Sequence, residues 1–163
     1  MLNVVHNQSV DMHGADSSAH GRNPALLGLA CLRCHAKYPL RLVHSGCPAC
    51  ALQRVYVSLA ADYLRSPMKA TYLPYKNAFS LGEGLTPLIE KILLAKNLGI
   101  GQLHIKDESA NPTGSHKDRM SAIGITQAID FGAHTVVLAS SGNAAISAAR
   151  YAQAAGLACE VAT

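Results

Sequence analysis

The sequence predicts a mixed α/β fold in which a small cysteine-rich ribbon precedes a doubly wound βαβαβ unit. Strand-like and helical patterns alternate from residue 103 to residue 161 with short loops between them, which is typical of a parallel sheet with right-handed crossovers. Two Cys-x-x-Cys pairs come earlier, and a Pro- and Tyr-rich stretch separates the two parts. We therefore expect a flexible tail (1–24), a ribbon (25–56), a linker (57–80) and a partial α/β unit (81–163).

The ribbon is predicted from four cysteines in two pairs, with twelve residues between the pairs. They are Cys31, Cys34, Cys47 and Cys50. Pairs at this spacing let four sulfurs reach one tetrahedral ion and are typical of structural zinc sites. Two disulfides are the alternative, which the lack of a secretion signal disfavours. Zinc knuckles often have glycine after the second cysteine, where this chain has His35 and Ala51.

The remaining residues before the α/β unit carry weaker signals. The tail contains His6, His13 and His20, whose spacing fits no ligand pattern. Residues 58–65 are interpreted as a short helix that the following Ser-Pro pair ends.

Composition sets broad limits on function. The chain is 49% hydrophobic and 15% charged, so a packed core is expected. Residues 22–76 hold eight Lys or Arg and one acid, Asp62. This excess would suit an acidic or nucleic-acid partner, but a solvated surface is the preferred interpretation because aromatic and basic residues do not interleave. Neither a signal peptide nor a membrane-spanning run is recognisable, so a cytoplasmic location is expected.

The α/β unit is predicted as a series of short elements. They are a helix over 90–97, a strand over 103–107, a helix over 117–131, a strand over 134–139, a helix over 144–155 and a strand over 157–161. Sheets of this type bind ligands at the carboxyl ends of their strands. The loops at 108–117 and 140–144 are therefore expected to share one site.

The first loop places a lysine at the start of a helix. Asn111-Pro112 and Thr113-Gly114 are turn sequences, and Thr113 or Ser115 can cap the helix that follows. Lys117 then lies in the first turn, where the helix dipole is positive and backbone N–H groups suit a phosphate. An amine beside a phosphate site is what pyridoxal 5'-phosphate (PLP) chemistry needs. The alternative is a surface lysine at a frayed helix end.

The second loop is Ser140-Ser141-Gly142-Asn143-Ala144, which opens the next helix. Its backbone N–H groups and hydroxyls would cradle an anion. An ordinary turn capped by Ser or Asn is the alternative, and the loop alone favours it.

A resemblance to a known family rests on two motifs. One is Lys106-Asp107-Glu108-Ser109 followed by Asn111-Pro112-Thr113-Gly114-Ser115-x-Lys117-Asp118-Arg119. The other is Gly82-Glu83-Gly84 with Thr86-Pro87-Leu88. Both resemble motifs of the threonine synthases and their relatives, the fold-type-II (tryptophan synthase β-like) PLP enzymes, and the cysteine pairs resemble the zinc ribbon of some threonine synthases. The resemblance implies an N-terminal part of such an enzyme, since the expected Gly-rich phosphate loop is absent.

The resemblance also implies roles for individual residues. Lys117 would carry the cofactor and then move protons at the substrate, and Asn143 would hydrogen-bond the ring hydroxyl of the cofactor. His116 stands where threonine synthases have phenylalanine, and a His-Lys pair lies near the phosphate in tryptophan synthase β-like members. Asp118 and Arg119 would give structural support. The substrate carboxylate would bind to Ser140, Ser141, Gly142, Asn143 and Ala144.

The implied activity is a PLP-dependent lyase reaction of the threonine synthase type. It would be a β- or γ-elimination or replacement on an amino acid or phosphoamino acid such as O-phosphohomoserine. A threonine/serine dehydratase-like or cysteate synthase-like enzyme is the alternative within this class. An inactive remnant that acts as a zinc-ribbon binding module is the alternative outside it. The expected partners are a small-molecule amino-acid substrate, a missing C-terminal half or second chain, and further copies in a complete enzyme; no membrane or nucleic acid is expected.

Overall fold

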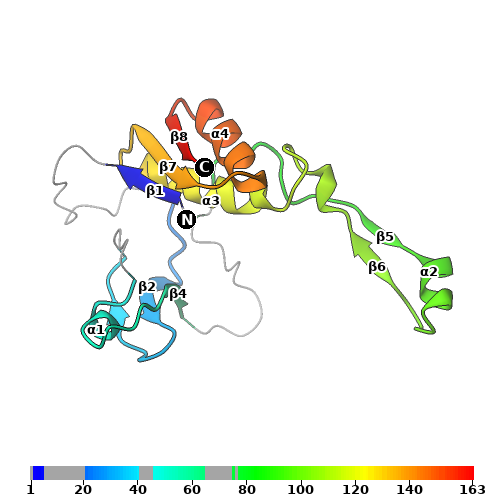
Figure 1. Cartoon of the computed structure of the whole chain (residues 1–163), viewed down its shortest axis with the longest axis horizontal. Helices are drawn as coiled ribbons and strands as arrows, with labels where there is room; N and C mark the ends of the chain where they lie inside the picture. The colour runs from blue at the N-terminus through cyan, green and yellow to red at the C-terminus, as the bar shows by residue number, and fades with distance from the viewer. Residues whose placement is uncertain (1, 6–20, 41–45, 65–74, 76) are drawn as a thin grey trace. The chain divides into compact units, whose positions relative to one another are not determined.

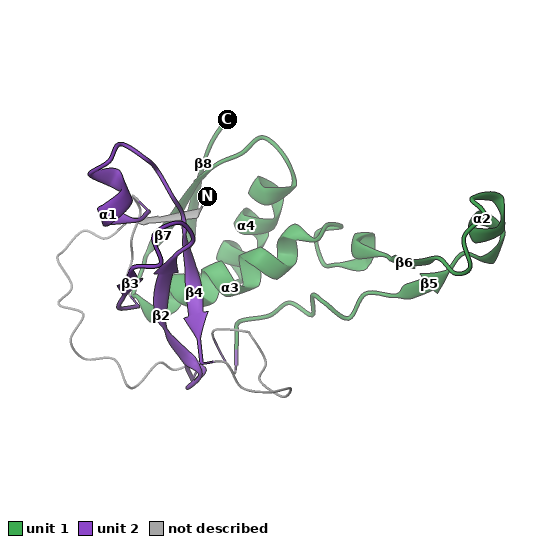
Figure 2. Ribbon diagram, turned by 90° about the horizontal axis from the view of Figure 1, so that it is seen from below, with its two compact units in different colours: residues 1–7, 78–163 green, residues 8–77 purple. Residues whose placement is uncertain are grey.

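The computed structural model describes residues 2–5, 21–40, 46–64, 75 and 77–163 of the chain. The chain divides into two compact units (Figure 2). The larger comprises residues 1–7 and 78–163, and the smaller comprises residues 8–77. The histidines expected in the tail, His6, His13 and His20, lie outside the described residues.

The smaller unit is built on a three-stranded antiparallel sheet. Its order is β3-β2-β4, with β2 (Leu26–Cys31) between β3 (Lys37–Tyr38) and β4 (Leu59–Tyr63). The pairing of β2 with β4 is irregular next to Gly28. Gly28 has a φ of +155°, and a Cβ there would lie 2.4 Å from the carbonyl oxygen of Tyr38, so only glycine fits this position.

Strand β4 shows that the helix expected over 58–65 is wrong. Leu59–Tyr63 instead pair with β2 along most of its length. A single short helix is marginal without tertiary contacts, whereas the edge of β2 offers a row of backbone partners. The strand lies inside the range expected as a linker, 57–80.

The larger unit holds a second three-stranded sheet, in the order β1-β7-β8 (Figure 1). Strands β7 (Thr135–Ala139) and β8 (Ala158–Ala162) are parallel, and α4 (Asn143–Ala154) connects them. Strand β1 (Leu2–Val5) pairs antiparallel with the other edge of β7. The flexible tail expected over 1–24 is therefore wrong for these residues, because the open edge of β7 supplies their backbone partners.

The doubly wound unit expected from the sequence is not confirmed. Strand β6 (His104–Lys106), predicted to begin it, pairs antiparallel with β5 (Leu88–Glu90) in a separate two-stranded sheet. All three residues of β6 are exposed, so this strand has no buried face to contribute to a parallel sheet. Helix α2 (Ile92–Asn97) joins the two strands. We call β5, α2 and β6 together the arm. It lies apart from the β1-β7-β8 sheet of the same unit in Figure 1.

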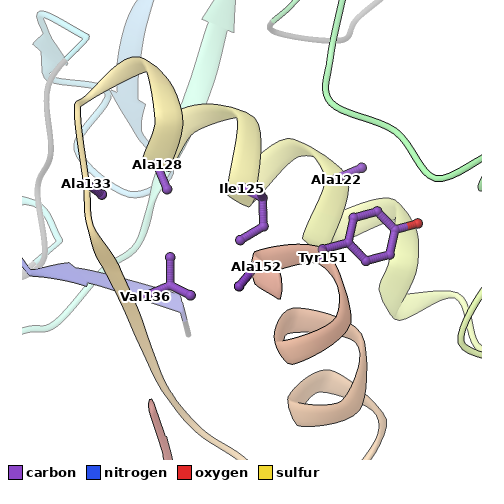
Figure 3. Packing of buried hydrophobic residues seen from close by; sticks show 7 residues of the cluster. All are labelled: Ala122, Ile125, Ala128, Ala133, Val136, Tyr151 and Ala152. Atoms are coloured by element: carbon purple, nitrogen blue, oxygen red, sulfur yellow. The ribbon is translucent and has the colours of Figure 1, made fainter. Parts of the chain in front are cut away.

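The core of the larger unit lies between the sheet and two helices, α4 and α3 (Lys117–Asp130). Figure 3 shows the buried side chains that meet there, which are Ala122, Ile125, Ala128, Ala133, Val136, Tyr151 and Ala152. Phe79 and Leu81 pack against this cluster from the segment before the Gly-Glu-Gly motif. This packing holds α3 and α4 side by side.

Candidate functional site

The four cysteines of the smaller unit converge on one point. Their Sγ atoms all lie within 4.8 Å of one another. The distance is 3.7 Å between Cys31 and Cys50, and 3.6 Å between Cys34 and Cys47. A tetrahedral ion with metal–sulfur bonds of about 2.3 Å holds its sulfurs about 3.8 Å apart. The cysteines form no disulfide, and their arrangement fits one metal ion.

Local backbone geometry directs the sulfurs toward each other. Cys31 ends β2, and the amide of His35 closes the following turn by donating to the Cys31 carbonyl at 3.1 Å. His35 has a left-handed φ of +59°, which explains why glycine is usual in such turns. Cys47 is the N-cap of α1 (Pro48–Ala51), so Cys50 follows within the same short helix.

Hydrogen-bond donors surround these sulfurs. The amides of Arg33 and Cys34 donate to Cys31 Sγ at 3.3 and 3.4 Å. The Tyr38 hydroxyl lies 3.1 Å from Cys47 Sγ. Such contacts stabilise sulfur in its charged, metal-binding form.

The buried thiols differ in how readily they lose a proton. Burial raises the pKa of the Cys50 thiol to about 12. Burial acts in the same direction at Cys47, but the Tyr38 hydroxyl and other donors outweigh it and lower the pKa of the Cys47 thiol to about 6. A divalent cation among them would hold all four as thiolates.

In the larger unit, the loop at 108–117, which we call the lysine loop, ends where α3 begins. Lys117 is the first residue of α3, and its amide donates to Ser115 Oγ at 3.3 Å. Asp118 is fully buried. Its carboxylate accepts hydrogen bonds from the Thr113 amide at 2.7 Å and from the Thr113 hydroxyl. These contacts fold the loop back onto the first turn of the helix.

A second network joins this loop to the Gly-Glu-Gly segment. Arg119 makes a two-point ion pair with Glu108, at 2.7 and 2.8 Å. Thr86 and Asn111 donate to the same carboxylate at 2.9 Å. The hydrogen bond from Arg119, followed by that from Asn111, lowers the pKa of Glu108 to about 2. The Gly84 amide donates to Asn111 Oδ1 at 3.0 Å, which connects the two sequence motifs.

A buried hydrogen bond joins the first turn of α3 to the second turn of α4. Ser147, one turn after Asn143, lies 2.6 Å from Asp118 Oδ1 and 2.7 Å from Ser121 Oγ. Because a hydroxyl has one proton and a carboxylate accepts, Ser147 donates to Asp118 and accepts from Ser121. The loops around Lys117 and Asn143 are therefore brought together by helix packing. The expected reason, a shared sheet edge, is wrong because β6 and β7 belong to different sheets.

At the start of α3 the Ser115 hydroxyl accepts from the Lys117 amide, but neither N-cap residue supplies a side-chain cap. His116 and Gly142 are the N-cap residues of α3 and α4, and neither makes a side-chain cap hydrogen bond. A Cβ added at Gly142 would meet nothing within 4 Å, so the space beside the start of α4 is open. Backbone N–H groups at such helix starts can bind an anion.

The predicted reactive side chains are accessible. Lys117 is half-buried, and His116 and Asn143 are exposed. Among the described residues, the side chains of these three make no hydrogen bond or ion pair. In the second loop, Ser140 and Ala144 are half-buried, and Ser141 and Gly142 are exposed.

Sequence reasoning missed two residues that shape these sites. Ser147 had a weak signal, since a serine four positions after Asn143 lies on the same face of an otherwise Ala-rich helix. Tyr38 had none, because its contact with Cys47 depends on how β3 folds beside the second cysteine pair.

Comparisons with known proteins agree with both motifs. Residues 79–163 match the family of pyridoxal-phosphate dependent enzymes. Three similar proteins are threonine synthases: those of Methanocaldococcus jannaschii (46% identical over 93 residues), Methanosarcina acetivorans (33% over 141 residues) and Bacillus sp. strain ULM1 (44% over 93 residues).

The extent of these matches is uneven. They cover 55%, 79% and 55% of this chain, but only 23%, 35% and 26% of the three relatives. The chain thus spans between about a quarter and a third of the length of the curated relatives that it matches. The similarity to the M. acetivorans protein covers more of the chain than residues 79–163 supply, so it extends into the smaller unit. None of the helices in the described residues has the length and apolar character needed to cross a bilayer.

Proposed function

Because the chain belongs to the pyridoxal-phosphate dependent enzymes, we propose that it is the lysine-bearing part of an enzyme of the threonine synthase type. Its reaction would be a β- or γ-elimination or replacement on an amino acid or phosphoamino acid such as O-phosphohomoserine, as catalysed by carbon–oxygen lyases. One observation carries this proposal: the Lys117 amine has no partner among the described residues and stands at the start of α3, which Asp118 and Ser147 connect to the opening of α4.

The residues present fit a phosphorylated aldehyde cofactor. A primary amine such as that of Lys117 can bond covalently to an aldehyde. The open start of α4 suits an anionic group of cofactor or substrate. When bound, the cofactor supplies an electron sink for negative charge at the substrate carbon.

The protein's own groups would then bind, orient and move protons. Lys117 would hold the cofactor and would move a proton at the substrate carbon. Asn143 would hold the ring hydroxyl, and His116 would help to hold the phosphate. Asp118 fixes the turn from which Lys117 projects. The substrate carboxylate binds to Ser140, Ser141, Gly142, Asn143 and Ala144.

The metal of the smaller unit is proposed to be zinc. Zinc prefers tetrahedral sulfur sites at the sulfur separations observed here. Four thiolates leave no position for a substrate, so the ion would be structural. It would link β2, which ends at Cys31, to the helix that holds Cys50.

The arm supports the proposal that a further region completes the enzyme. Seven large apolar side chains in the elements of the arm and in the loop after α2 are exposed: Leu88, Ile92, Leu93, Leu94, Leu98, Ile100 and Ile105. Apolar surface of this kind marks an interface, and a two-stranded sheet is marginal by itself. We propose that the arm packs against the part of the family fold beyond the matched portion, supplied by the same polypeptide or by a second one. That region would also carry the phosphate loop.

A PLP titration of the purified chain tests the lysine assignment. We expect a visible absorbance band from bound cofactor that Lys117→Ala abolishes and the exposed arm variant Lys96→Ala keeps. A band that survives Lys117→Ala unchanged would refute the assignment. Circular dichroism of each variant checks that the fold is retained.

Two further measurements distinguish the alternative functions. A band that forms only after adding a polypeptide that covers the remaining part of the M. acetivorans relative would support the partner region. No band in either case favours the inactive remnant. Phosphate release from O-phosphohomoserine in the completed enzyme supports the threonine synthase type, whereas 2-oxo acid formed from threonine or serine favours a dehydratase.

A further inference from the structure

Tyr38 reaches the cysteine cluster from the neighbouring strand. It is the last residue of β3 and pairs with Leu29 of β2, which places its ring beside the second cysteine pair. Its hydroxyl oxygen lies 3.1 Å from Cys47 Sγ. The backbone amide of Ala49 lies 3.5 Å from the same oxygen. The hydroxyl therefore stands between one fixed donor and one sulfur.

These two contacts fix the direction of the hydrogen bond. The amide of Ala49 can only donate, so the Tyr38 oxygen accepts there. A metal-bound thiolate carries no proton and can only accept. The Tyr38 O–H therefore points at Cys47 Sγ.

A hydrogen-bond donor beside Cys47 Sγ would offset the negative charge of the cysteine cluster. Four thiolates around one divalent ion leave a net charge of about −2, and Cys31, Cys47 and Cys50 are each only 1% exposed. Hydrogen bonds to ligand sulfurs spread such charge and orient the ligands. The side chain of Arg33 also approaches Cys50, but it is exposed and its contact is 3.9 Å long, so it should contribute less.

We infer that Tyr38 is a positioning residue of the metal site, whose hydroxyl donates to the Cys47 thiolate, orients it and offsets its charge, so that the site holds the ion more tightly. This inference rests on the proposed metal site of the smaller unit and is independent of the PLP chemistry. Tyr38→Phe is a clean probe, because it removes the hydroxyl and keeps the ring. Tyr56→Phe is the matched control, since Tyr56 belongs to the same unit and is 85% exposed.

The experiment uses the full chain with two metals. Zinc affinity is measured by competition with a chromogenic chelator, and cobalt(II) serves as a spectroscopic probe of the metal–sulfur bond. We expect Tyr38→Phe to bind zinc about 10- to 100-fold more weakly. We also expect its sulfur-to-cobalt charge-transfer band to move to longer wavelength, because loss of the hydrogen bond raises the energy of the sulfur electrons. Tyr56→Phe should change neither quantity.

Three results would overturn the inference. Wild-type zinc affinity and an unshifted band in Tyr38→Phe would show that the hydroxyl does not act on the sulfur. Weaker zinc binding with an unshifted band would show a packing role alone. A wild-type chain that takes up neither metal would refute the metal site itself, whereas the first two results would leave that site standing.

Discussion

Asp118 offers the sharpest test of how the lysine loop is held. Its carboxylate is fully buried and accepts from the Thr113 amide, the Thr113 hydroxyl and the Ser147 hydroxyl. Asp118→Ala leaves all of these donors without their acceptor. Asp118→Asn keeps an acceptor oxygen but turns an N–H group toward donors. Ser147→Ala removes the two contacts that link α4 to Asp118 and Ser121 and leaves the Thr113 contacts in place.

The expected cost follows from burial. A buried donor without an acceptor costs about 1–3 kcal/mol. Ser147 is fully buried and falls within that range, whereas Thr113 is half-buried and its donors fall near the lower limit. We expect Asp118→Ala to lower the free energy of unfolding by about 3–5 kcal/mol, and Asp118→Asn and Ser147→Ala by about 1–2 kcal/mol each. The first value is a large fraction of the stability of an ordinary domain.

Urea denaturation followed by circular dichroism at helical wavelengths measures these costs. The signal reports on this unit because α3 and α4, with 14 and 12 residues, are the longest helices of the described residues. Glu160→Ala is the matched control, since Glu160 is an exposed carboxylate on β8, and it should change stability by less than about 0.5 kcal/mol. A loss below about 1 kcal/mol in Asp118→Ala would refute the reasoning, because the buried donors would then have found other acceptors.

Three further predictions concern charge, metal and the arm. The pKa of Glu108 is lowered from 4.5 to about 2, so its stabilising effect is present above pH 4.5 and is lost as the pH falls toward 2. The difference in melting temperature between wild type and Glu108→Gln should therefore close as the pH falls from 4.5 to about 2. A difference that stays constant over this range would contradict the ion pair. Metal analysis should find about one zinc ion per wild-type chain and little zinc in Cys50→Ser. Cys159→Ser is the control and should keep its zinc, because Cys159 lies in the other unit. Equal zinc content in all three proteins would exclude the cysteine cluster as the metal site. Leu93→Glu on the arm should reduce self-association in sedimentation measurements, because exposed apolar surface of this kind marks an interface. Leu52→Glu should not reduce it, although Leu52 is 89% exposed and Leu93 is 78% exposed. Equal effects would show that the arm is not an interface.

Some elements could be predicted because their signals are local. The start of α3 at Lys117 follows from the turn residues just before it, and the observed helix begins there. The cysteine cluster follows from spacing, since a Cys-x-x-Cys turn sets both sulfurs of a pair on one side. The strands at 135–139 and 158–162 follow from short apolar, β-branched runs.

Other elements could not be predicted because they depend on partners far away in the chain. Leu59–Tyr63 read as a helix by local pattern but form a strand because β2 has an edge to pair with. The sequence predicts β6 as a strand, but this strand pairs with β5 and not with β7.

The sequence by itself identified the residues that we propose to bear the chemistry of this chain: the lysine at a helix start, the loop at 140–144 and the four cysteines. Their types and spacings act within one or two turns of backbone, where geometry depends on neighbouring residues alone. Only the tertiary structure decided that Ser147 joins the two loops and that Tyr38 reaches Cys47. These contacts form between segments that approach each other only when apolar surface is buried, and that burial is a property of the whole fold.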